Sequence, residues 1–394
     1  MQLFKSTVFF SISAFIVFSC SGNSSETVSD GVMANYRLEI FDSLQFDILT
    51  RSLIVADVDE KTGNRLIIQS GTPKVWIYNA NGEVLAEKEF LKSDPEGPGD
   101  YLMSGTFFGD GVALLGKFAV VLLDEELQFE KVLRPQYSPS QMHFIGKKHI
   151  YQFTKNDNQP ALITYFGEAQ TDLWGGIEGY FDEFNLVDVV EPELYTNPRD
   201  SVFLPFGDLT PDSRYRNGKA HYFLRPVFDL KDNLLHYVLN TDTTFFRRNL
   251  PDGDIVDSYT IPYDEFVFFD GYSMGSAGEA EQYKPRNREG RVESVFRVGE
   301  FDLILYYSGM ELSAMEKYRN SPDAYEQIER SDYLKYLIVK DGKRVNKELK
   351  MNPKVNYLEY ADHNEIIYGM QNISMLDEEP ERYTIYMMRI VADE

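Results

Sequence analysis

A hairpin that recurs along the chain constrains the fold more than any other sequence feature. Residues 74–90 (KVWIYNANGEVLAEKEF) alternate apolar and polar side chains, turn at Asn81 and Gly82, and then alternate again. Asn-Gly favours a tight hairpin turn because both residues tolerate a positive φ, and alternation with a period of two is typical of strands. Similar hairpins lie at residues 118–133, 234–250 and 333–349. Such recurrence predicts a repeat architecture.

The strand-like segments group into successive sets of four, with the last set one strand short. The sets are 52–57, 64–69, 74–78 and 83–90; 101–108, 111–117, 118–123 and 127–133; 141–146, 148–154, 161–166 and a weak strand near Thr171; 202–206, 220–228, 234–240 and 244–250; 292–298, 301–307, 333–340 and 343–349; and 355–360, 365–370 and 383–391. The missing strand is available at the other end of the chain, where residues 36–41 (YRLEIF) alternate without a partner.

A first strand that completes the last set is typical of a circular propeller, because shared strands in one blade hide both open edges. We therefore predict an all-β fold, a six-bladed β-propeller of four-stranded antiparallel blades over residues 36–394, closed by its N-terminal strand. A seventh blade would need a strand at residues 265–270 (EFVFFD). A pair of two-sheet sandwiches is the alternative fold.

The N-terminus predicts an export signal. Lys5 precedes an apolar run at residues 8–18, and Ser19 and Cys20 follow it, so residues 1–20 match a signal peptide that is too short to span a membrane. Cys20, the single cysteine, lies where a bacterial lipoprotein signal places its lipidated residue. We expect acylation of Cys20 and a flexible tether at residues 21–35, which are rich in small polar residues. The alternative is a free cysteine in an ordinary secretory signal.

Composition narrows the class of partner. The formal charge is −24, which argues against nucleic acid, since binding phosphates requires clustered Lys and Arg. Beyond the N-terminus no run of 18 apolar residues occurs, so no internal membrane span is expected. Aromatic residues make up 14% of the chain and suit strands, and 394 residues can form a large core without disulfides.

A family resemblance follows from these features together with one loop. Residues 96–101 (EGPGDY) form a Gly-Pro-Gly-acid-aromatic loop after the first hairpin. With the lipoprotein-like start and the repeated hairpins, this chain resembles the six-bladed β-propeller lipoproteins of Bacteroidetes-type bacteria, which are similar in fold to TolB-like and NHL-type propellers. The resemblance implies a fold and a location at the cell envelope, anchored by lipid to the outer membrane. It implies no catalytic residues.

Four long insertions are expected on one face of the propeller. Strands alternate in direction, so the loops between second and third strands emerge on the same face as the loops between blades. The insertions at residues 174–200, 251–291, 308–332 and 374–382 all fall in these two classes of loop. Loops on a rigid scaffold commonly carry binding sites. Residues 310–330 predict two short helices that cap this face, so a small helical insertion is expected near 309–331.

Two of these insertions supply the candidate ligand-binding residues. Aromatic side chains beside carboxylates suit stacking on sugar rings or capture of a cationic group, and a basic cluster suits an anion. The candidates are Trp174, Glu178, Tyr180, Asp182, Glu183, Arg286 and Arg288. The competing interpretations are a lid whose aromatic residues pack onto the blades and a solvated basic loop.

Catalytic, metal and cofactor signals are weak. No nucleophile elbow, phosphate loop or dinucleotide fingerprint is present, and the histidines show no metal-ligand spacing. Residues 57–63 (DVDEKTG) fit an Asp-rich hairpin turn better than a calcium loop, because Ile68 occupies the place of the bidentate Glu. We therefore expect no cofactor and no metal. The prediction is a non-catalytic propeller that binds a glycan, peptide or envelope protein. The alternative is a propeller-type glycan hydrolase or lyase that uses carboxylates at the channel mouth.

Overall fold

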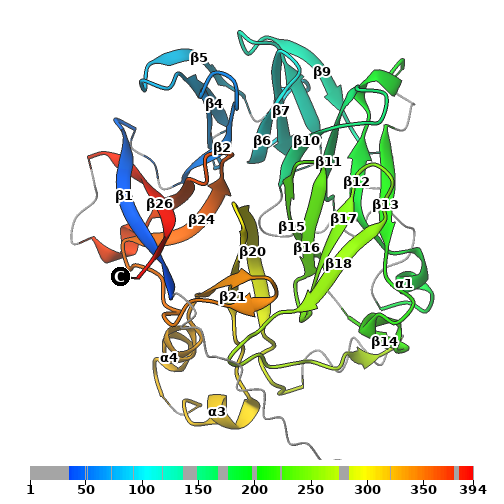
Figure 1. The fold of residues 1–394 in the computed structure, drawn as a ribbon, viewed down its shortest axis with the longest axis vertical. Coiled ribbons are helices and arrows are strands. Elements are labelled where there is room, and N and C mark those ends of the chain that lie inside the picture. The colour runs from blue at the N-terminus through cyan, green and yellow to red at the C-terminus, as the bar shows by residue number, and fades with distance from the viewer. Residues whose placement is uncertain are drawn as a thin grey trace, which may run out of the picture. The chain divides into compact units, whose positions relative to one another are not determined.

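The computed structural model describes residues 35–393 except 49, 51, 72, 92, 118, 136–148, 167–175, 198–201, 222–223, 275–283, 320 and 377–380. The predicted signal peptide, Cys20 and the tether up to residue 34 lie outside the described residues. The described residues form a six-bladed β-propeller of four-stranded antiparallel sheets, as predicted. In Figure 1 the sheets surround a common centre, with the first strand of each blade innermost.

The bounds of the strands are as follows. Blade 1 contains β2 (Leu53–Val58), β3 (Arg65–Gln69), β4 (Lys74–Tyr78) and β5 (Val84–Glu89). Blade 2 contains β6 (Leu102–Phe108), β7 (Gly111–Gly116), β8 (Val120–Leu123) and β9 (Phe129–Leu133). Blade 3 contains β10 (Ile150–Thr154), β11 (Pro160–Thr164), β12 (Asn185–Val190) and β13 (Phe203–Asp208).

The second half of the ring repeats this order. Blade 4 contains β15 (Pro226–Lys231), β16 (Leu234–Leu239), β17 (Thr244–Asn249) and β18 (Ile255–Thr260). Blade 5 contains β20 (Arg291–Val298), β21 (Phe301–Tyr307), β22 (Lys335–Lys340) and β23 (Lys343–Arg344). Blade 6 contains β24 (Val355–Ala361), β25 (Ile367–Gln371), β26 (Tyr383–Ala392) and β1 (Tyr36–Phe46).

The predicted closure of the ring by the N-terminal strand is confirmed. β1 pairs antiparallel with β26, from Tyr36 opposite Ala392 to Phe46 opposite Tyr383, with one register shift between Ile40 and Asp42. Segments more than 300 residues apart in sequence thus become neighbours in one sheet. β26 therefore has a hydrogen-bonded partner on each side, β25 and β1. The last strand of the chain is not left as an open sheet edge.

Blades 3 and 4 differ from the sequence-based assignment by one strand. The strand predicted at residues 202–206 to open blade 4 is β13, the fourth strand of blade 3, whose third strand is β12 within the insertion predicted at 174–200. The strands predicted at 141–146 and near Thr171 lie outside the described residues. β18, expected within an insertion, completes blade 4. The prediction failed because five of the six residues of β12 are buried, so a run of residues without alternation marks it. Residues 265–270 form no strand, so the alternative of a seventh blade is wrong.

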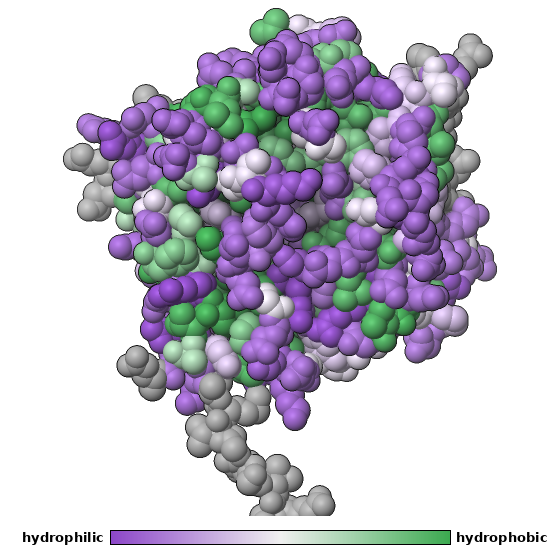
Figure 2. Space-filling view, turned by 45° about the horizontal axis from the view of Figure 1, so that its top comes forward, coloured by the Kyte–Doolittle hydropathy of each residue, from purple (hydrophilic) through white to green (hydrophobic). Residues whose placement is uncertain are grey.

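The hydrophobic core consists of layers between neighbouring blades. Six clusters of buried residues fill the six junctions of the ring. β3 shows how the sequence produces this arrangement, because successive side chains of a strand point to opposite faces of its sheet. Leu66 and Ile68 pack in the cluster shared with blade 2, whereas Ile67 between them packs in the cluster shared with blade 6. Hydrophilic residues cover most of the surface visible in Figure 2, with small hydrophobic patches among them.

The long insertions emerge on one face, which we call the insertion face. Loops between second and third strands (165–184, 308–334 and 372–382) and connections between blades (209–225 and 261–290) all open on it. The helical insertion predicted near 309–331 is present as α3 (Leu312–Glu316) and α4 (Ala324–Ser331). The opposite face, which we call the short-loop face, carries the turns between first and second strands. The error of one strand in blade 3 did not change the face predicted for this insertion. Loops between second and third strands and loops between blades both open on the insertion face.

Removal of β1 tests the closure of the ring. A chain that begins at residue 34 keeps β1, whereas a chain that begins at residue 48 exposes the edge of β26 and the blade 6 residues beneath it. We expect the shorter chain to aggregate or to unfold without a cooperative transition, because an unpaired long strand next to an opened core templates association. Thermal unfolding followed by circular dichroism, with size-exclusion chromatography, measures this. Equal melting temperatures for the two chains would contradict the structural role of β1.

Candidate functional site on the insertion face

Of the two predicted aromatic candidates, Tyr180 forms part of a cap on blades 3 and 4, and Trp174 lies outside the described residues. Tyr180 begins the short helix α1 (Tyr180–Glu183) and is only 1% exposed. Its ring packs edge-on against Phe181 and Phe184, with centroids 4.9 and 5.7 Å away. Tyr180 therefore anchors the cap to the core and has no open face for a ligand.

The predicted acidic candidates lie on the exterior of this cap. Glu178, Asp182 and Glu183 are exposed. Asp182 forms an ion pair with Arg216, with 2.9 Å between its carboxylate and the guanidinium. The pair joins α1 to the turn η4 (Arg214–Arg216) in the connection between blades 3 and 4. The three carboxylates therefore lie on the exposed edge of the cap and do not line a pocket. We call this edge, formed by Glu178, Asp182 and Glu183, the rim.

The predicted basic candidates hold insertions in place. The guanidinium of Arg286 lies 4.4 Å from the ring centroid of Phe269 and 5.1 Å from that of Tyr272. Arg288 forms ion pairs with Glu329 at 2.7 Å and with Asp332 at 3.0 Å, and these fix α4 against the blade connection. Both cations are engaged by side chains of the chain itself.

The two connections that flank blade 4 join each other above it. β14 (Lys219–Ala220) pairs antiparallel with β19 (Tyr272–Ser273). Beneath this pair lies His221, which is 5% exposed and packs edge-on against Tyr215 with 4.9 Å between ring centroids. Burial, reinforced by the charge of Arg214, lowers the pKa of His221 to about 4. The histidine is therefore a neutral packing element of the cap at physiological pH.

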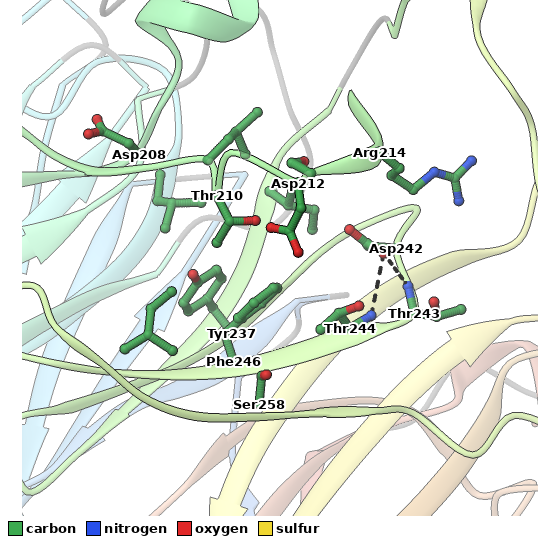
Figure 3. A pocket seen from close by; sticks show the side chains of 15 residues that line it. Asp208, Thr210, Asp212, Arg214, Tyr237, Asp242, Thr243, Thr244, Phe246 and Ser258 are labelled. Atoms are coloured by element: carbon green, nitrogen blue, oxygen red, sulfur yellow. Dashed lines mark hydrogen bonds between the residues drawn. The ribbon is translucent and has the colours of Figure 1, made fainter. Parts of the chain in front are cut away.

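A pocket opens on the insertion face between blades 3 and 4 (Figure 3). Its volume is about 470 Å³, which is in the range of small-molecule sites. One wall comes from the end of β13 and the connection that follows it, and the other from β16, β17, β18 and the β16–β17 turn. The polar residues that line it are Asp208, Thr210, Asp212, Ser213, Arg214, Asp242, Thr243, Thr244 and Ser258.

Asp242 is the most constrained polar group of this pocket. It is 8% exposed, and its Oδ1 accepts hydrogen bonds from the backbone N–H groups of Thr243 at 2.7 Å and Thr244 at 3.4 Å. Figure 3 shows both bonds on one oxygen, with the second carboxylate oxygen turned toward the loop that carries Asp212. Burial raises the pKa of Asp242, and the Arg214 charge counteracts part of that rise. The geometry fixes a carboxylate with one oxygen available to a ligand.

Apolar side chains line the same cavity beside these polar groups. Tyr237 and Phe246 stack with 5.2 Å between ring centroids and 16° between ring planes, and Leu186 and Leu239 add to this apolar lining. Arg248 lies over Tyr237 at 5.9 Å from the ring centroid, which fixes the tyrosine from below. Carboxylate, hydroxyl and apolar surfaces thus converge on one cavity. Such a lining suits a ligand with hydroxyl donors along one side and an apolar face on the other.

Among the described residues, no three or more His, Cys, Asp or Glu side chains converge in a way that could hold a metal ion. Within the same part of the chain, no helix is long and apolar enough to cross a bilayer.

The residues of this pocket were not predicted as site residues. Residues 241–243 (TDT) and 209–214 (LTPDSR) lie between the strands that the sequence pattern predicts at 202–206, 220–228, 234–240 and 244–250. The signal available was the density of short hydroxyl and carboxylate side chains in both segments. Only the pairing of β13 with β12 places the second segment opposite the first.

Comparisons with known proteins support the fold. No protein-family profile and no curated protein matches the sequence. Among solved structures, a member of the DUF4221 family from Bacteroides vulgatus ATCC 8482 has a TM-score of 0.58 at 11% identity, covering 92% of this chain and 100% of that one. A predicted exported protein of Bacteroides fragilis NCTC 9343 has a TM-score of 0.52 at 10% identity, covering 91% and 96%. These likenesses extend over the whole propeller and concern its fold.

The contact between Gly271 and His221 can be tested with a matched pair of substitutions. Gly271 has a φ of +91°, and a Cβ there would lie 2.7 Å from His221 Nε2. Gly82 has a φ of +84° and open space around the same position. Both alanine variants place a side chain on a left-handed backbone, so this cost is common to the two. Only the Cβ at position 271 also clashes with His221, and we therefore expect Gly271→Ala to be less stable than Gly82→Ala by about 1–3 kcal/mol. Denaturant unfolding measures the difference, and equal losses would contradict the packing described here.

The lowered pKa of His221 predicts acid sensitivity. Between its unfolded value near 6.5 and its folded value of about 4, the unfolded chain binds more protons, so stability falls as pH decreases through this window. The shift corresponds to about 3 kcal/mol. We expect His221→Gln to flatten the dependence of the unfolding free energy on pH between 6.5 and 4, while His363→Gln on the short-loop face leaves it in place. An unchanged slope in His221→Gln would contradict the prediction.

Proposed function

We propose that this chain is a non-catalytic, extracytoplasmic propeller that binds a carbohydrate in the pocket between blades 3 and 4. We further propose that a signal peptide exports it and that acylation of Cys20 attaches it to the outer membrane. The export proposal rests on the N-terminal pattern, and the exported neighbour from Bacteroides fragilis has the same fold. The binding proposal rests on the pocket itself.

The observation that carries the binding proposal is the half-satisfied carboxylate of Asp242. A buried carboxylate with an open oxygen is costly unless a donor reaches it, and a sugar offers pairs of hydroxyl donors. Thr210, Thr244 and Ser258 add hydroxyl groups around the cavity. The side chains of Tyr237 and Phe246 supply an apolar surface for the C–H face of a sugar ring. A peptide or an envelope protein is the other partner class that this face could accept, and it would use the rim of the cap.

A glycan hydrolase is the second candidate function. Asp212 and Asp242 line the pocket from facing loops, and burial raises the pKa of Asp242, as a general acid requires. This reading predicts turnover of a bound glycan that is lost in both Asp212→Asn and Asp242→Asn. Binding without turnover favours the first candidate.

Substitution of Asp242 tests the proposal. The purified full-length chain is screened on an immobilised glycan panel, and the strongest glycan is then titrated by calorimetry. We expect Asp242→Asn to weaken binding by about tenfold or more, because a hydrogen bond to a charged group contributes about 1.5–3 kcal/mol. The amide oxygen can still accept from Thr243 and Thr244, so the fold is retained.

The matched control is Asp254→Asn, which makes the same chemical change in the exposed β17–β18 turn of the same blade. We expect this variant to bind as the unsubstituted chain does. Equal affinity of Asp242→Asn and Asp254→Asn would exclude the pocket as the binding site. If no glycan binds and the chain captures a peptide or an envelope protein, the carbohydrate proposal is wrong. The rim of the cap then becomes the proposed binding surface.

A further inference from the structure

A second cavity system lies at the centre of the short-loop face. Two cavities of about 350 and 280 Å³ share the lining residues Glu60, Tyr151, Gln152, Leu230 and Tyr360. These residues come from the innermost strands of blades 3, 4 and 6 and from the turn after the innermost strand of blade 1. The two cavities therefore form the mouth of the central channel, on the face opposite the pocket of Figure 3.

Asp57 of blade 1 is held in this channel by four donors. Its Oδ1 accepts from the hydroxyl of Tyr360 at 2.6 Å and from the backbone N–H of Val58 at 2.8 Å. Its Oδ2 accepts from the hydroxyl of Thr106 at 2.7 Å and from the backbone N–H of Phe107 at 2.8 Å. The tyrosine belongs to the preceding blade of the ring and the threonine and phenylalanine to the following one.

Asp229 of blade 4 repeats this arrangement. It accepts from the backbone N–H groups of Leu230 at 2.9 Å and Arg297 at 2.6 Å, and it is hydrogen-bonded to the hydroxyl of Tyr151. Again the tyrosine comes from the preceding blade and a backbone donor from the following one. Blades 1 and 4 are opposite each other in a ring of six. The channel therefore contains two tyrosine–aspartate pairs related by an approximate twofold axis along the channel.

The paired geometry determines which hydrogen-bonding groups remain for a ligand. Each tyrosine hydroxyl gives its only proton to a carboxylate, so its oxygen keeps lone pairs that can accept from a group in the channel. The donors that surround Asp57 and Asp229 are all neutral, and within the described ranges no lysine or arginine forms an ion pair with either. What remains toward the channel is a set of acceptors close to two carboxylates.

The channel is also negatively charged, which favours a cationic ligand. The pKa of Tyr151 and that of Tyr360 are each raised by burial and by both aspartates, so the four groups lie within electrostatic reach of one another. Burial raises the pKa of Asp229 to about 6, because desolvation of the carboxylate outweighs its hydrogen bonds and the attraction of Lys231. The side chains that line the two cavities include the five carboxylates of Asp57, Asp59, Glu60, Asp229 and Asp232, against the two ammonium groups of Lys61 and Lys231.

We infer that the short-loop mouth of the central channel binds a primary ammonium group, carried by a small amine, between the two tyrosine–aspartate pairs. An ammonium group offers three donors and a positive charge to a site that presents acceptors and negative charge. A divalent metal is a poorer match, because no three metal-ligating side chains converge within the described residues. The cavity volume admits a diamine or an amino acid side chain, and the site is independent of the pocket between blades 3 and 4.

Titration of the full-length chain with 1,5-diaminopentane tests the inference. Isothermal calorimetry at pH 7.5 is expected to show saturable binding at one site per chain. Asp229→Asn keeps an acceptor for the backbone donors and removes the charge, and Tyr151→Phe removes the phenolic oxygen. Each is expected to weaken binding at least tenfold, and the variants are checked for an unchanged circular dichroism spectrum before titration.

Asp110→Asn is the matched control, since Asp110 lies in the exposed β6–β7 turn of the same face without lining either cavity. It is expected to bind the diamine within twofold of the unsubstituted chain, as is Asp242→Asn on the opposite face. Equal weakening by Asp110→Asn would show only non-specific attraction to an acidic protein and would overturn the inference. Absence of saturable binding would overturn it too, and so would saturable binding of calcium chloride that excludes the diamine.

Discussion

The pairing of β1 with β26 is the interaction on which the rest of the structure depends. A ring of blades buries its hydrophobic layers only if every blade has two neighbours, and blade 6 is complete only when the first strand of the chain joins the last. Its ten backbone-paired positions extend from Tyr36 to Phe46. Phe46 at the end of this strand is buried in the cluster that blade 6 shares with blade 1. Closure thus links the hydrogen-bonded sheet to the packing of the first junction.

In the closed ring, the core lies between the blades, so the insertion face and the short-loop face carry different loops. The blades contact one another through aliphatic and aromatic layers, and loop residues such as Tyr180 and Tyr215 extend one of these layers on the insertion face. The insertion face carries the cap, in which Tyr180, Phe181 and His221 are buried beneath the paired connections. The short-loop face has tight turns that leave the channel mouth open, so Asp57 and Asp229 reach it from the innermost strands. A ligand site on each face is consistent with this separation.

Blade 3 contains the strand that the sequence pattern did not predict. The β4–β5 hairpin was assigned correctly, because the Asn81-Gly82 turn marks it and its second strand, β5, is largely exposed. β12 was missed because it is buried along nearly its whole length and follows a long insertion. For the candidate site residues too, local features were predicted and distant partners were not. Arg286 and Arg288 were recognised as a basic cluster, but the carboxylate and aromatic partners that engage them come from segments up to 44 residues away in sequence.

The sequence by itself determined the propeller class, the number of blades, the closing strand and the face on which the insertions emerge, because these depend on a local period of two and on chain direction. The tertiary structure decided which side chains meet. Asp242 became a site residue only when β13 brought residues 209–214 against blade 4. Tyr360 lies 303 residues from the Asp57 it contacts. No local pattern encodes such pairs, since their proximity arises from the circular order of the blades.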